Sequence, residues 1–247
     1  MAEIVNLGSL YLNGQPIDLG VEYNGEVLSF GNTIPGKTIP FVKWGKLLVA
    51  SQCVCINISW EQLNKAGYIF GRPVKIDGVP YLCRSLKVGE KKNVSNEWDS
   101  ILKDLGENDN LWHWSDGYFW GQETPIDRRF ISTRAVRGYL SANSWSHHSA
   151  TTRLVRVGFR PTLESLPPAP LISDALIGAG LKVYGPDTAI IGQLVEYTDY
   201  DLVMAPNSGL RSPRKCQWAR KDGKYIIINR TAIVWMDEGG VVHGGDR

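Results

Sequence analysis

The chain has 247 residues, of which 43% are hydrophobic and 21% charged, and its formal net charge is +2. This is an ordinary globular composition, and the length allows one large domain or two smaller ones. The small net charge argues against nucleic acid as a partner. Because no apolar run is long enough to span a bilayer and the N-terminus does not begin a signal peptide, we expect a protein made in the cytoplasm that has no membrane partner.

Residues 1–45 are rich in glycine and β-branched residues. Asn13-Gly14 and Asn24-Gly25 are typical of hairpin turns, and the flanking strands are predicted at 10–12 and 27–30. We therefore assign residues 1–45 to an N-terminal β-rich extension.

The next stretch, 46–58, is apolar and predicts one buried strand that carries Cys53 and Cys55 on one face. The four cysteines contain no CxxC pair, so buried thiols are favoured over a metal site. We expect no cofactor.

Two helices are predicted from capping signals. Ser59 with Gln62 three residues later resembles a capping box and begins a short helix at 60–66. Residues 96–105 have apolar side chains at helical spacing, and Gly106 ends that helix. Between the two helices, Asp77-Gly78 predicts a hairpin within 72–84.

An aromatic run follows at 111–120. The even spacing of Trp112, Trp114, Tyr118 and Trp120 places them on one face of a predicted strand, where they would fill a core.

The stretch from 128 to 164 is the part of the sequence most suggestive of function. Two apolar runs with arginines, 133–138 and 153–161, predict strands, and a polar segment with Trp145, His147 and His148 lies between them. Such an arrangement is typical of recognition sites, because variable side chains stand on a rigid support. We call residues 139–153 the recognition segment.

Seven arginines and one carboxylate, Asp127, lie between positions 127 and 160. One interpretation is a site for single-stranded nucleic acid. We favour the other, in which the arginines hold the framework by bonding to backbone carbonyls and to carboxylates such as Glu97 or Asp99. The arginines to which this applies are Arg134, Arg137, Arg156 and Arg160.

Beyond this stretch, Pro167-Pro168 indicates an extended linker at 166–171. Short strand patterns follow at 181–184, 190–197, 201–204, 224–228 and 232–235, with a hairpin signal at Asp222-Gly223. This spacing predicts a small β-barrel or sandwich domain over 172–247.

Four short motifs occur in order: Asn-Ile-Ser-Trp at 57–60, Asn-Glu-Trp-Asp at 96–99, Arg-Gly-Tyr at 137–139 and Gly-Phe-Arg-Pro at 158–161. Over residues 45–164 the chain thereby resembles C-type-lectin-like proteins related to formylglycine-generating (sulfatase-modifying) enzymes, in an uncharacterised branch from Firmicutes and their phages. The resemblance implies an α+β fold with a C-type-lectin-like domain at 46–165. It also implies that the recognition segment faces a ligand.

The resemblance does not extend to the family's chemistry. No cysteine lies between Arg84 and Lys215, so the copper-binding pair of the formylglycine-generating enzymes is missing, and a metal-dependent enzyme of that type is disfavoured. His147 and His148 with His113 do not have the spacing of a metal site, because adjacent residues on a strand point in opposite directions. The calcium-binding triplets of lectins are also missing.

We therefore expect a non-enzymatic, phage-related binding protein. The predicted partner-binding residues are Tyr139, Asn143, Trp145, His147, His148, Thr151 and Arg153. The partner would be a protein or a cell-surface ligand. One use is a tail or receptor-recognition component of a phage or phage-like particle, which predicts a homo-oligomer; the alternative is an intracellular inhibitor that binds a host defence complex.

Overall fold

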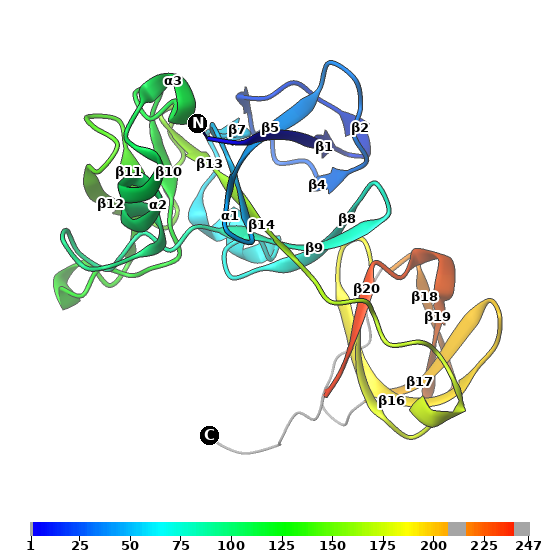
Figure 1. The fold of residues 1–247 in the computed structure, drawn as a ribbon. Coiled ribbons are helices and arrows are strands. Elements are labelled where there is room, and N and C mark those ends of the chain that lie inside the picture. Colours follow the sequence, from blue (N-terminus) through cyan, green and yellow to red (C-terminus); the bar gives the residue numbers. More distant parts are fainter. Residues whose placement is uncertain (1, 207–215, 240–247) are drawn as a thin grey trace. The chain divides into compact units, whose positions relative to one another are not determined.

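The computed structural model describes residues 2–206 and 216–239. The chain divides into two compact units, Met1–Leu166 and Pro167–Arg247. Each unit has its own hydrophobic core, and the described residues form three sheets, one of them curled into a half-barrel. Figure 1 shows the strands of both units.

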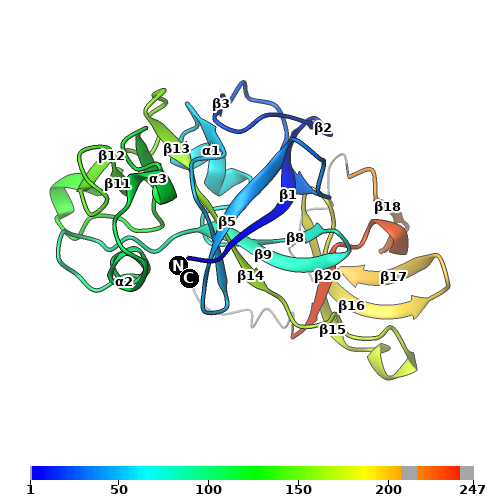
Figure 2. The ribbon, with the colours of Figure 1, turned by 45° about the horizontal axis from the view of Figure 1, so that its top comes forward.

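The first sheet of the first unit has the order β2-β1-β5-β6-β14-β9-β8, with β4 paired to β1. Strands from residues 1–45 thus pair directly with strands from the rest of the unit, because β5 lies beside β6. Figure 2 shows β1 and β5 side by side. The strands are β1 (Ile4–Leu12), β2 (Gln15–Pro16), β4 (Leu28–Gly31), β5 (Thr38–Trp44), β6 (Leu47–Ala50), β8 (Arg72–Ile76), β9 (Val79–Ser85) and β14 (Pro161–Ser165).

The second sheet of this unit carries the recognition segment and has the order β12-β11-β10-β13-β7-β3. Its central strands β10 and β13 are parallel, and β11 and β12 form an antiparallel hairpin at one end of the sheet. The strands are β3 (Val21–Glu22), β7 (Cys55–Ile56), β10 (Tyr118–Trp120), β11 (Thr133–Gly138), β12 (Trp145–Ser149) and β13 (Val157–Phe159).

Three α-helices occur among the described residues: α1 (Trp60–Lys65), α2 (Glu97–Leu105) and α3 (Asp109–Trp112). The predicted capping box begins α1, since Ser59 accepts from the Gln62 amide and the Gln62 side chain accepts from the Ser59 amide. Short 3-10 turns lie at η1 (Arg128–Phe130), η2 (Asp174–Leu176) and η3 (Arg230–Ala232).

Both faces of the second sheet are buried. On one face, Trp120, Val136 and Phe159 belong to the core shared with the first sheet and α1. On the other, Phe119 and Ala135 pack in the core that contains α2 and its Trp98. Trp98 meets Phe119 edge-to-face with ring centroids 4.9 Å apart, a favoured aromatic geometry.

In the second unit, residues 167–206 and 216–239 form a six-stranded sheet in the order β18-β19-β17-β16-β15-β20. The predicted hairpin at Asp222-Gly223 joins β18 to β19, whereas the predicted strand at 232–235 begins only at Trp235. The strands are β15 (Gly180–Tyr184), β16 (Ala189–Tyr197), β17 (Asp201–Pro206), β18 (Ala219–Asp222), β19 (Tyr225–Asn229) and β20 (Trp235–Glu238).

The expected α+β, C-type-lectin-like fold is wrong. Strands account for 43% of the structure and helices for 12%. The physical reason is that α1 and α2 are only 6 and 9 residues long, so each covers a small part of one sheet face. The sheets, not the helices, bury most of the apolar side chains.

Three predicted strands also differ. The stretch 46–58 is two strands, β6 in the first sheet and β7 in the second, because the chain changes sheet between Ala50 and Cys55. In 111–120, Trp112 ends α3 and only Tyr118–Trp120 is a strand. Residues 153–156 form a turn closed by the bond from the Val157 amide to the Leu154 carbonyl.

The chain also passes between these two sheets at Arg160, from β13 in the second sheet to β14 in the first. The Arg160 side chain is fully buried and donates to the carbonyls of Ala50 (3.1 Å), Ser51 (2.7 Å) and Trp112 (2.5 Å). Its guanidinium also lies over the Phe119 ring, 4.7 Å from the centroid. Burial lowers the pKa of Arg160 to about 10.

We predict that Arg160→Met destabilises the protein by about 3 kcal/mol or more, because three buried carbonyls lose their donor. Urea unfolding followed by tryptophan fluorescence measures the change. The exposed Arg156→Met is the matched control, and equal midpoints for the two variants would contradict the prediction.

Candidate recognition site

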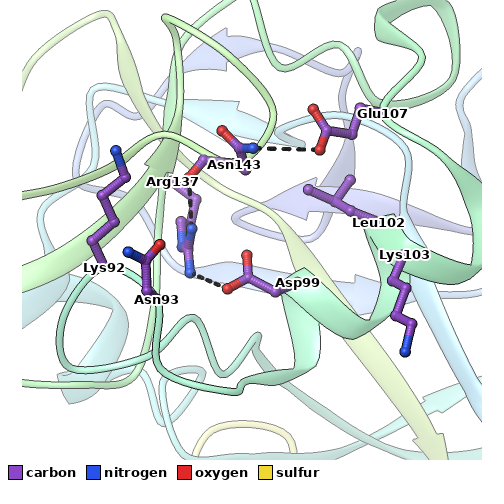
Figure 3. Close-up of a pocket in the computed structure, with 8 residues that line it drawn as sticks. All are labelled: Lys92, Asn93, Asp99, Leu102, Lys103, Glu107, Arg137 and Asn143. Atoms are coloured by element: carbon purple, nitrogen blue, oxygen red, sulfur yellow. Dashed lines mark hydrogen bonds and ion pairs between the residues drawn. The ribbon is translucent and has the colours of Figure 1, made fainter.

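Arg137 anchors the hairpin that carries the recognition segment. It is almost fully buried and donates to the Val88 carbonyl (3.0 Å), the Asn143 carbonyl (2.7 Å) and the Asp99 carboxylate (2.9 Å). Figure 3 shows the last two bonds. Burial holds the pKa of Arg137 below its ordinary value, and the Asp99 carboxylate offsets part of this effect.

Asn143 lies at the mouth of a pocket of about 250 Å³ beside this anchor. Its side-chain amide donates to Glu107 at 3.4 Å, across the top of the pocket in Figure 3. The ammonium groups of Lys92 and Lys103 point away from each other there, so they do not converge on one ligand position. The polar groups that line the pocket therefore bond to one another in a structural hydrogen-bond network that includes Asn143.

The turn after β11 has an unusual backbone. Gly138 has φ of +100°, and a Cβ added there would lie 2.7 Å from the Gly117 carbonyl oxygen, so the position requires glycine. Tyr139 has φ of +72°, which is uncommon for a bulky residue. Its amide donates to the Trp114 carbonyl at 2.6 Å, which helps to hold this conformation.

The Tyr139 ring lies between two partners. The ring centroids of Tyr139 and Tyr118 are 5.2 Å apart. The Arg156 guanidinium lies over the Tyr139 ring, 5.1 Å from its centroid, in a cation–π contact. Arg156 also donates to the Tyr139 hydroxyl. A pocket of about 210 Å³ opens beside these residues, lined by Leu19, Gly20, Gln52, Cys53, Ile56, His113, Asp116, Gly117, Tyr118, Val155 and Arg156.

The thiol in this pocket is not a poised nucleophile. Burial in its surroundings raises the pKa of Cys53 to about 11, so the thiol stays protonated near neutral pH. Its sulfur lies 3.8 Å from the Tyr118 carbonyl, and its described contacts contain no hydrogen bond to His113. The arrangement is suited to binding rather than to thiolate chemistry.

Trp145 and His147 share one face of β12. The Trp145 indole donates to the Gly89 carbonyl at 2.8 Å, and its ring centroid is 5.8 Å from that of His147. His147 in turn packs on Phe130 with centroids 4.2 Å apart. Trp145 and His147, both predicted to bind a partner, are thus half-buried and packed against other residues of the same chain.

His148 faces the opposite side, toward Tyr118 (5.3 Å between centroids) and Trp120 (6.4 Å). Its Nε2 atom is buried without a hydrogen-bond partner in the described structure. The pKa of His148 lies below its ordinary value, first because of burial and second because of the neighbouring His147.

Thr151 and Arg153 lie at a third place, an open groove of about 680 Å³ beside α1 that also contains Trp60 and Arg134. Arg153 donates to the Asn57 carbonyl at 3.0 Å and the Tyr23 carbonyl at 2.7 Å, so it fastens the end of the recognition segment. Thr151 is exposed and bonds to the Ser149 hydroxyl.

The seven predicted residues therefore do not form one patch. Asn143 lies at the Arg137 anchor and Tyr139 beside Tyr118 and Arg156. The other five lie on the two faces of β12 (Trp145, His147 and His148) and in the groove beside α1 (Thr151 and Arg153). The framework role proposed for the arginines is confirmed for Arg134, Arg137 and Arg160, which donate to backbone carbonyls, and Asp99 is a predicted carboxylate partner. Glu97 instead pairs with Arg84 at 2.6 Å.

Sequence reasoning missed the side chains that are most exposed here. Leu140 is 74% exposed, Val155 53% and Leu154 47%. A turn rather than a strand at 153–156 places the last two outward, and the sequence carried no signal for this turn. We define the recognition surface as Tyr118, Tyr139, Leu140, Leu154, Val155 and Arg156.

The described residues contain no group of three or more His, Cys, Asp or Glu side chains placed to hold a metal ion. Within the same ranges, none of the helices has the length and apolar character needed to cross a bilayer. No family model, curated protein or solved structure matches the chain.

The depressed pKa of His148 predicts acid sensitivity. Between its unfolded value of about 6.5 and its lower folded value, the unfolded chain binds the proton more readily, so stability falls as the pH decreases through this window. We expect His148→Gln to lose less free energy of unfolding than the parent between pH 7.5 and about pH 5. Urea titrations at both pH values measure this, with His113→Gln as the histidine control; an equal loss in parent and His148→Gln would refute it.

Proposed function

We propose that this protein is a non-enzymatic binding protein that recognises a protein partner through the recognition surface. The observation that carries the proposal is that Leu140 on the recognition segment, and Leu154 and Val155 directly after it, are exposed beside backbone that side-chain hydrogen bonds hold in place. Exposed apolar side chains beside tyrosine and arginine are typical of the anchor residues of protein interfaces.

The segment is fastened at several points. Arg137 holds the Asn143 carbonyl, Trp145 holds the Gly89 carbonyl, and Arg153 holds the Tyr23 carbonyl. A surface already fixed in its bound conformation loses little conformational entropy on binding, which favours affinity. The exposed Leu140 lies on the hairpin that these bonds fix, and the exposed Leu154 and Val155 follow Arg153 directly.

The pocket beside Tyr118 adds a concave feature to the surface. Its walls combine apolar Leu19, Ile56 and Val155 with the charged Asp116 and Arg156. At about 210 Å³ it is smaller than the usual 300–1,000 Å³ pocket of a small-molecule ligand. It is suited to accept a single side chain of a partner.

The setting proposed for this activity, a tail or receptor-recognition component of a phage or phage-like particle, rests on the sequence resemblance. Its support is the order of the four motifs between 57 and 161.

A double variant tests the binding surface. We expect Leu140→Asp with Val155→Asp to weaken partner capture about tenfold or more, because a carboxylate at an apolar contact must be desolvated without a partner. Affinity capture from a Firmicute lysate with quantitative mass spectrometry measures it. Val27→Asp, which changes a side chain 63% exposed elsewhere in the unit, is the control and should capture as the parent does. Equal capture by all three proteins would place the site elsewhere.

The particle setting predicts co-sedimentation. If the protein is a particle component, it will migrate with purified phage or phage-like particles in a density gradient and resist a salt wash. Recovery only in the slowly sedimenting fractions, bound to a host protein complex, would favour the inhibitor role instead.

A further inference from the structure

β12 lies at the open edge of its sheet. It stands first in the strand order and pairs only with β11, and in Figure 1 the hairpin forms the outer side of this sheet. An edge strand presents a row of backbone donors and acceptors to which another strand can pair.

The direction of these groups follows from the ladder. The Gly138 amide donates to the Ser144 carbonyl and the Ala150 amide to the Ser132 carbonyl. Because hydrogen-bonded positions alternate in an antiparallel pair, even-numbered residues of β12 face β11 and odd-numbered ones face outward.

Trp145 and His147 are therefore the outward positions. In the described part of the chain, their backbone N–H and C=O groups have no hydrogen-bond partner, whereas the carbonyl of Ser149 accepts from Thr152. Four groups in line remain available, at the spacing that an added strand uses.

The edge also lacks the usual protection against pairing. Edge strands commonly carry lysine, proline or inward-pointing charges, and the sequence Trp-Ser-His-His-Ser contains none of these. It is 5 residues long, which is enough for a short added strand.

The two faces beside the edge have different chemistry. On one, Trp145, His147 and Phe130 form an aromatic row. On the other, His148 lies opposite Arg134, whose guanidinium stands 4.4 Å from the Trp60 ring centroid and donates to the Ile131 and Thr133 carbonyls. Arg134 has no carboxylate partner in the described structure.

We propose that an extended segment of the protein partner, with alternating apolar and acidic residues, adds to the sheet at β12. Its backbone pairs with Trp145 and His147, its apolar side chains lie on the aromatic row, and its carboxylates face Arg134. The inference rests on the proposed binding function and specifies how the partner is held. A second copy of the chain is a poorer occupant, since two antiparallel β12 strands place both Arg134 side chains on the same face.

The test uses a fluorescent nine-residue peptide of alternating valine and glutamate. Two control peptides have the same residues in blocks, or lysine in place of glutamate. Fluorescence anisotropy with the full chain measures the dissociation constants. We expect binding of the alternating acidic peptide, and at least tenfold weaker binding of both controls.

Two variants at one position separate backbone pairing from side-chain contact. His147→Pro removes an outward N–H without breaking a bond to β11, and proline is tolerated on edge strands. Both variants lose the imidazole ring, so we expect His147→Pro to bind at least tenfold more weakly than His147→Ala. Thermal unfolding checks that both fold; a peptide N-methylated at alternate amides tests the same bonds with the parent protein and should not bind.

Each other result overturns the inference. Equal binding by His147→Pro and parent, or unimpaired binding of the N-methylated peptide, would exclude backbone pairing. If the alternating peptide does not bind, the proposed partner chemistry is wrong. If the protein forms a dimer that His147→Pro abolishes, the strand that pairs with β12 belongs to a second copy of the chain. If the peptide does not bind but partner capture is lost in the Leu140→Asp, Val155→Asp variant, the proposed binding function holds without strand addition at β12. If the peptide binds but that variant captures the partner normally, the recognition surface is wrong and strand addition at β12 holds.

Discussion

A single buried guanidinium joins the two sheets of the first unit. Arg160 lies where the chain passes from β13 into β14, and its carbonyl acceptors at Ala50 and Ser51 lie where the chain passes from β6 toward β7. Two of the crossings between the sheets therefore meet at one side chain. A buried charge without such acceptors would cost several kcal/mol, so the position tolerates arginine only because the crossing backbone surrounds it.

The same principle recurs at the recognition segment. Arg137 and Arg153 each bond to main-chain carbonyls that sheet pairing leaves free, at Asn143 and at Tyr23 and Asn57. Irregular backbone has carbonyls to satisfy, and arginine offers five donors in a fixed geometry. The arginine-rich stretch between 127 and 160 thus holds irregular chain around a small sheet. Arg134 also donates to the Ile131 and Thr133 carbonyls while it stacks on Trp60, whereas the Arg156 side chain contacts only the Tyr139 side chain among the described contacts.

Local signals predicted local structure well. The capping box at Ser59, the helix beginning at Asn96 and the turn at Asp222-Gly223 all depend on neighbours a few residues away, and each is present. β11 was also predicted, from the apolar run with arginines at 133–138. The sequence also predicted that the arginines would pair with carboxylates such as Asp99 or Glu97, because opposite charges in a buried region need partners. Asp99 pairs with Arg137, whereas Glu97 pairs with Arg84.

What the sequence could not show depends on contacts between distant residues. β12 has a polar sequence and is a strand only because β11 lies beside it, so its periodicity carried no signal. The division of 46–58 into two strands follows from pairing with β14 and β13, more than a hundred residues later. The strand predicted over 153–161 begins only at Val157, because the side chains of 153–156 are exposed on a turn. The site residues were dispersed for the same reason, because position on a sheet decides which way each one points.

The parallel pairing of β10 with β13 has a consequence for how this chain can change. These neighbours are separated in sequence by residues 121–156. Within that stretch, β11 and β12 extend the same sheet on the side of β10 that faces away from β13. The tip of that hairpin, 140–144, takes no part in the pairing of β10, β13 and β7. The exposed side chains of Leu140 and Asn143 can therefore be exchanged while the central strands keep their register, whereas an insertion at the tip would displace the buried Ala142, whose carbonyl accepts from the Trp98 indole.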